Sequence, residues 1–113
     1  MLEIDRLDAM LKEAGIPFER RNEDLRPQGR NYYKFQIMYP RSNCFVHVKP
    51  YRVCSIIQGT CSYGGNENLL EIMGLLTPEE ARHDYVCGHL TAENVFERIK
   101  KHWEKDGKEA VKK

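Results

Sequence analysis

The sequence predicts an α+β fold in which an antiparallel sheet packs against helices as a two-layer sandwich. Three observations carry this prediction. Apolar residues recur at helical spacing near both ends of the chain, the middle alternates between apolar and polar residues as strands do, and 113 residues suit a single core. We expect an N-terminal helix, a meander of three to four strands and then two to three helices. Residues 1–107 would form one domain, and the polar residues 108–113 a flexible tail.

The first helix is predicted by an apolar stripe with charged residues between its members. The stripe consists of Ile4, Leu7, Met10, Leu11 and Ala14. Gly15 follows directly, as a left-handed residue that ends a helix would. Residues 19–21 follow Pro17 and are expected to form an edge strand, because proline cannot donate to a strand ladder. Residues 22–30 are expected to form a loop.

The next strand is predicted over residues 32–39, where the alternation is clean. One side of this strand would face the helices and carries Tyr33, Phe35, Ile37 and Tyr39. The other side would face outward and carries Tyr32, Lys34, Gln36 and Met38. Further strands are expected over residues 44–49 and 52–58, separated by Pro50 and Tyr51.

The second half of the chain is expected to be helical. A short helix around residues 69–73 would run between a cap at Asn66 and a stop at Gly74. Thr77, Pro78 and Glu80 have the spacing of a capping box and predict a helix ending near residue 84. A loop would follow. Thr91 would cap the last helix, which ends at Gly107 and whose buried stripe is Val95, Phe96, Ile99 and Trp103.

Composition narrows the class of protein. A net charge of +1 does not favour a protein that binds polyanions over its whole surface. No apolar run approaches the roughly 18 residues of a membrane span, and no secretory signal opens the chain, so we expect a cytoplasmic protein without a membrane partner. The four cysteines are irregularly spaced, which favours reduced thiols in that compartment.

One stretch of the chain has an unusual composition. Residues 31–66 contain no Asp or Glu, although these make up 17 of the 113 residues, and they hold five of the six tyrosines. We therefore expect the central sheet to form an acid-poor surface that favours anions and flat rings. Strand composition alone would also produce much of this pattern. The candidate ligand- or partner-binding residues are Tyr32, Lys34, Lys49, Arg52, Tyr63, Gly64 and Gly65.

Residues with metal-binding or catalytic side chains form weaker patterns. Cys44, His47, Cys87 and His89 are potential zinc ligands, but the first two would point to opposite faces of a strand. We therefore expect neither metal nor cofactor. Cys87 beside a histidine is the one arrangement that would suit a small cysteine-dependent hydrolase, with His83 or His89 as base and Asp84 as orienting group. Without a further motif, the sequence favours a protein that is not an enzyme.

Residues 68–80 and 88–99 resemble a group of small uncharacterised proteins from prophages and mobile elements of low-GC Gram-positive gut bacteria. The likeness includes residues 52–65 and, more loosely, residues 14–20, so it covers about half of the chain. No activity is assigned to that group. The resemblance implies an accessory protein of a phage or integrated element that acts in the bacterial cytoplasm, where such proteins often work by occupying a partner.

The leading hypothesis is therefore a non-enzymatic binding protein that uses the sheet and the Gly64–Gly65 turn. Its partner would be a host or phage protein, with self-association through the sheet remaining open. The first alternative is capture of an anion, either a nucleotide signal or a nucleic acid, by the same residues. The second alternative is the cysteine-dependent hydrolase.

Overall fold

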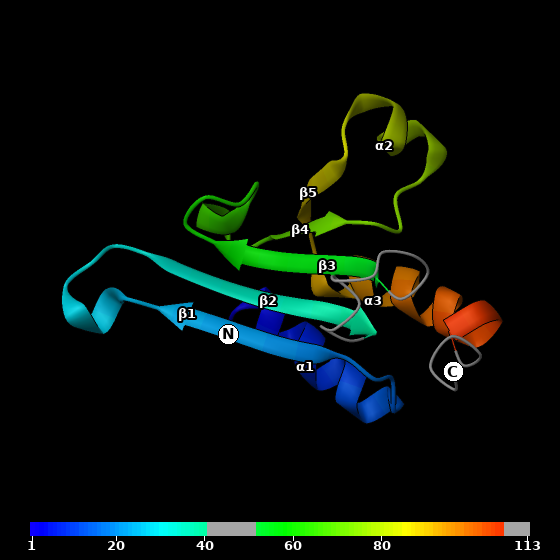
Figure 1. The fold of residues 1–113 in the computed structure, drawn as a ribbon, viewed down its shortest axis with the longest axis horizontal. Helices are drawn as coiled ribbons and strands as arrows, with labels where there is room; N and C mark the ends of the chain where they lie inside the picture. Colours follow the sequence, from blue (N-terminus) through cyan, green and yellow to red (C-terminus); the bar gives the residue numbers. More distant parts are fainter. Residues whose placement is uncertain (41–51, 108–113) are drawn as a thin grey trace.

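The computed structural model describes residues 1–40 and 52–107 (Figure 1). The fold is α+β, with an N-terminal helix α1 (Glu3–Ala14), a five-stranded antiparallel sheet, and helices α2 (Pro78–His83) and α3 (Ala92–His102). The strands are β1 (Glu19–Asp24), β2 (Tyr33–Pro40), β3 (Arg52–Gly59), β4 (Leu70–Met73) and β5 (Val86–Leu90). Short 3-10 turns occupy Arg26–Gln28 (η1) and Gly65–Glu67 (η3), and a π-helical turn, Trp103–Gly107 (η4), continues α3. Within the described ranges, no helix is long and apolar enough to cross a membrane.

The sheet is a meander in which each strand pairs with its neighbours along the chain, in the order β1-β2-β3-β4-β5. The expectation of three to four strands is therefore wrong. The expected strand over residues 44–49 lies outside the described residues. The sheet instead gains two strands from the second half of the chain, β4 and β5, where we expected a helix and a loop.

The helix expected at residues 69–73 is wrong because tertiary pairing outweighs the local pattern. Leu70 and Ile72 are completely buried, whereas Glu71 and Met73 between and after them are not. This alternation has the period of a strand. β4 is hydrogen-bonded to β3 on one side and to β5 on the other. Gly74, with φ +105°, ends a strand rather than a helix.

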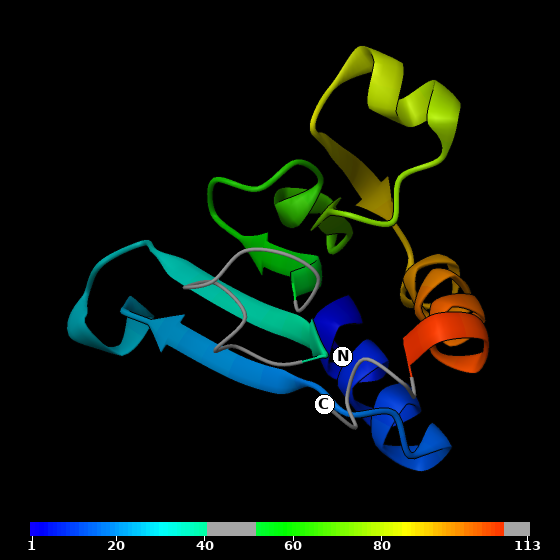
Figure 2. The same cartoon turned by 45° about the vertical axis from the view of Figure 1, so that its right-hand side comes forward.

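The core lies between the sheet and the helices α1 and α3, whereas α2 contributes no buried residue to it (Figures 1 and 2). α1 contacts α3, β2 and β3. The predicted helix-facing side of β2 is confirmed, since Phe35, Ile37 and Tyr39 belong to the core. The predicted stripes of α1 and α3 also reach the core, with their most buried members being Ile4, Leu7, Leu11, Val95 and Ile99.

A buried polar network joins the start of α1 to the sheet. The first backbone N–H groups of a helix lack partners within the helix, and Leu2 provides no side-chain cap. Asn68 Oδ1 accepts from the Glu3 N–H at 2.9 Å, and Gln58 Oε1 accepts from the Ile4 N–H at 2.9 Å. Gln58 also donates to Asn68, and Asn68 donates to the Met1 carbonyl. The N-terminus of α1 is thus capped from β3 and from the turn before β4.

The helix caps predicted for α2 and α3 are confirmed. Thr77 and Glu80 form a reciprocal capping box at the start of α2, with Pro78 at the first helical position. The Thr91 hydroxyl accepts from the Asn94 N–H at the start of α3. Gly15, with φ +71°, ends α1 as expected.

Candidate binding surface on the outward face of the sheet

The side of the sheet opposite the core is formed by rows of residues that pair across the strands. We call this surface the outward face. One row joins Lys34 of β2 to Glu23 of β1, and the next joins Arg21, Gln36, Ile57 and Glu71. A third row crosses β1 to β5. It consists of Glu19, Met38, Ser55, Met73 and Val86. Met38 and Ser55 are buried although they lie on this side of the sheet, so the expected exposure of this side is wrong at Met38.

The acid-free stretch of sequence does not form the acid-poor surface that we expected, and this expectation is wrong. β1 lies beside β2 with Glu23 directly opposite Lys34, and β4 brings Glu71 opposite Ile57. Three carboxylates, including that of Glu19, therefore belong to the outward face. The chain segments on both sides of the acid-free stretch supply the acids, because a meander places them next to it in space. The face carries mixed charge.

Two of the predicted site residues, Tyr32 and Lys34, lie together at one end of this face. Both line a hollow of about 180 Å³ that also takes in Cys61 and the end of β3. Lys34 is exposed and also lines a second hollow of about 490 Å³ against Arg21 and Glu23. Desolvation and the nearby Glu23 carboxylate raise the pKa of the Tyr32 phenol. Of the other basic candidates, Lys49 lies outside the described residues, and for Arg52 only the backbone is described.

Packing accounts for the glycines of the Gly64–Gly65 turn. Gly64 has φ +88°, and a Cβ on Gly65 would lie 2.0 Å from the Gly59 carbonyl oxygen. The turn also uses backbone donors that an anion would need. The Tyr63 N–H donates to the Glu71 carboxylate at 2.8 Å, and the Gly65 N–H donates to the Ser62 carbonyl. A carboxylate therefore already occupies one position that a bound phosphate would take.

Large apolar side chains are exposed near β4 and β5. Met73 of the outward face is 44% exposed, Tyr63 beside Glu71 is 57% exposed, and Tyr85, just before β5, is 87% exposed. The neighbouring Ile57 is partly exposed. Aromatic residues and methionine are enriched at protein interfaces. Sequence analysis did not identify Met73 as a surface residue because its segment was expected to be helical. The alternation of Leu70 and Ile72 with Glu71 and Met73 was the signal that could have indicated a strand.

Cys87 is held in its thiol form by its surroundings. Its Sγ donates to Glu80 Oε2 at 3.5 Å. Burial raises the pKa of the thiol, and the Glu80 carboxylate raises it further. A nucleophilic cysteine needs the opposite effect from a neighbouring base or cation. His89, one of the two histidines considered as its base beside His83, lies instead with Nε2 3.8 Å from Glu67 Oε1. This arrangement gives the hydrolase alternative no support.

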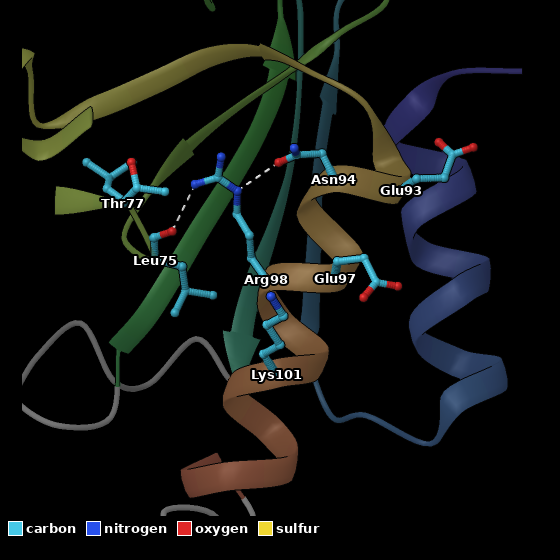
Figure 3. Close-up of a pocket in the computed structure, with 8 residues that line it drawn as sticks. Leu75, Thr77, Glu93, Asn94, Glu97, Arg98 and Lys101 are labelled. Atoms are coloured by element: carbon cyan, nitrogen blue, oxygen red, sulfur yellow. Dashed lines mark hydrogen bonds between the residues drawn. The ribbon is translucent and has the colours of Figure 1, made fainter. Parts of the chain in front are cut away.

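Glu80 belongs to a structural ion pair that sequence analysis did not find. Its two carboxylate oxygens accept from the Arg98 guanidinium at 2.7 and 2.8 Å. Arg98 also donates to the Leu75 carbonyl and to Asn94 (Figure 3). The hydrogen bonds from Arg98, with a contribution from the Thr77 backbone, lower the pKa of Glu80 to about 2. The pair joins α2 to α3 across the residues that follow β4.

The residues described by the structure contain no cluster of three or more His, Cys, Asp or Glu side chains placed to hold a metal ion. Cys61 and Cys87 are free thiols. Cys44 and His47, the other two residues considered as zinc ligands, lie outside the described residues. Comparison of the chain with protein-family models, curated proteins and solved structures finds no significant match.

Proposed function

We propose that this chain is a non-enzymatic binding protein that engages a protein partner through the outward face of its sheet. The observation that carries the proposal is the exposure of Met73 on that face and of Tyr63 beside the face's Glu71. Exposed apolar anchors surrounded by polar residues are typical of protein interfaces. In the setting that the sequence resemblance implies, the partner is a host or phage protein of the bacterial cytoplasm.

The mixed charge of the face favours a protein over a polyanion. A nucleic-acid site gains most of its affinity from lysines and arginines that neutralise phosphates. Here Glu23 lies opposite Lys34, and Glu71 holds the Tyr63 N–H. A negatively charged ligand would meet both carboxylates. Against a protein, the same charges supply complementary contacts at the rim and help to select the partner.

The proposal is tested by photo-crosslinking in bacterial cells that produce the protein. Benzoylphenylalanine would replace Met73 in one variant and Ala9, an exposed residue of α1, in a matched control. We expect one defined protein to be crosslinked at position 73 and not at position 9. Crosslinking to nucleic acid at position 73, or equal crosslinking of the same protein at both positions, would contradict the proposal.

A further inference from the structure

The exposed side of α3 carries charges in an order that would match a second, antiparallel copy of the same helix, with acids opposite bases. Glu93, Glu97 and Lys101 follow one another at four-residue steps, so they lie along one stripe of the helix. Lys105 continues the spacing in η4. All four side chains are exposed. The stripe is thus acidic in its N-terminal half and basic in its C-terminal half.

The two central charges of the stripe are available to an incoming molecule. Glu97 and Lys101 are spaced as a helical ion pair, but they form no ion pair or hydrogen bond with each other or with any other described residue. Glu93 is bound by Arg6 of α1 and remains more than half exposed. An occupant of this surface would therefore meet an unpaired anion and an unpaired cation one helical turn apart.

A groove of about 760 Å³ runs beside this stripe, between α3 and residues 75–77 (Figure 3). Leu75 and Leu76 provide its apolar wall, and both are partly exposed. Leu75 has φ +55°, an uncommon conformation for a bulky residue. Its carbonyl is fixed by Arg98 from the facing helix. The apolar wall is thus held in place next to the charged stripe.

We propose that this surface binds a second copy of the chain, with the two α3 helices antiparallel about a twofold axis level with Ile99. This arrangement sets Glu97 beside Lys101 of the second copy, and Glu93 beside its Lys105. The twofold symmetry forms each contact twice. Exposed ion pairs add little affinity on their own, so burial of Leu75 and Leu76 supplies the attraction, and the charges select the antiparallel arrangement.

The dimer would leave the outward faces free. The buried side of α3 belongs to the core on the opposite side of the sheet. Two outward faces in one particle would bind a partner with two copies of its site much more tightly than one face does. Only this consequence rests on the proposed function. The dimer itself is tested without any partner.

The test uses charge reversal and sedimentation velocity of the purified chain at low salt, about 50 mM, and at concentrations up to about 1 mM. We expect the wild type to dimerise. Glu97→Lys and Lys101→Glu, each alone, should weaken the dimer on the order of tenfold or more, because each places like charges together twice. An equimolar mixture of the two variants should restore a dimer, and so should the double variant. Glu13→Lys, an exposed reversal on α1, is the matched control and should change nothing.

Three results would overturn the proposal. They are a wild type that stays monomeric over the whole range, reversals that leave the dimer unchanged, and a mixture of the two single variants that fails to associate although circular dichroism shows both to be folded. None of them bears on partner binding by the outward face, which a monomer can perform equally well.

Discussion

Replacement of Glu80 by Gln should destabilise the protein in a way that disappears in acid. The depression of the Glu80 pKa from 4.5 to about 2 corresponds to about 3 kcal/mol of stability by proton linkage. The carboxylate is 26% exposed and its partner Arg98 is 16% exposed. Solvent screening therefore reduces the expected loss to about 2 kcal/mol. Gln keeps the size of Glu and can still serve in the capping box with Thr77.

The pH dependence of this loss gives its cause. Because the pKa is lower in the folded state, the stabilising effect of Glu80 is complete above pH 4.5 and is lost as the pH falls through about 2. Urea unfolding of the wild type and of Glu80→Gln, followed by circular dichroism, should differ by about 2 kcal/mol near neutral pH. The difference in unfolding free energy should approach zero as the pH falls to about 2. The neighbouring Glu79→Gln is the control and should stay within about 0.5 kcal/mol of the wild type.

Two results would refute this reasoning. If Glu80→Gln were as stable as the wild type at neutral pH, the ion pair with Arg98 would not contribute to the folded state. If the difference persisted undiminished in acid, its cause would be packing or lost hydrogen bonds rather than the charge of Glu80.

Three further predictions follow from the packing around the sheet. Alkylation by iodoacetamide near pH 8, mapped by mass spectrometry, should modify the exposed Cys61 well before Cys87, whose pKa is raised; equal rates would contradict the placement of Cys87. Asn68→Ala should cost roughly 1 kcal/mol more than Asn68→Gly in urea unfolding, because both lose the cap of α1 but only Ala retains a Cβ at φ +59°; equal losses would contradict the left-handed conformation. Gly65→Ala should destabilise by about 2 kcal/mol or more, since its Cβ would meet the Gly59 oxygen, whereas Gly29→Ala has open space and only conformational strain; the reverse order would refute the packing of the turn.

Local patterns predicted the parts of the fold whose signals are carried by neighbouring residues. The Thr77 capping box and the stop at Gly15 each act over a few positions, and the structure contains both. The alternation along β2 holds from Lys34 to Ile37 and fails at Met38, which is buried. β4 and β5 were missed because strands of four and five residues give too short a pattern to separate them from a helix or a loop. Their identity is decided by the pairing of β4 with β3 and of β5 with β4, which the sequence of each segment does not encode.

The candidate site was predictable only where its signal is local to one strand. Alternation along β2 correctly placed Lys34 on the exposed side of the strand. The charge of the surface was not predictable from one stretch, because the carboxylates opposite Lys34 and Ile57 come from β1 and β4. The Glu80–Arg98 pair joins residues 18 positions apart and has no local signature.

The central claim, that the outward face binds a protein, is tested most directly by titrating the crosslinked partner, once purified, against the wild type and Met73→Asp in a calorimeter. The account predicts that Met73→Asp weakens binding on the order of tenfold or more, and that raising the salt from about 50 to about 300 mM changes the wild-type affinity only slightly. Arg82→Ala, an exposed change on α2, should bind as the wild type does. An affinity that is indifferent to Met73→Asp, falls steeply with salt and is lost in Lys34→Ala would contradict the claim and identify an anion site instead.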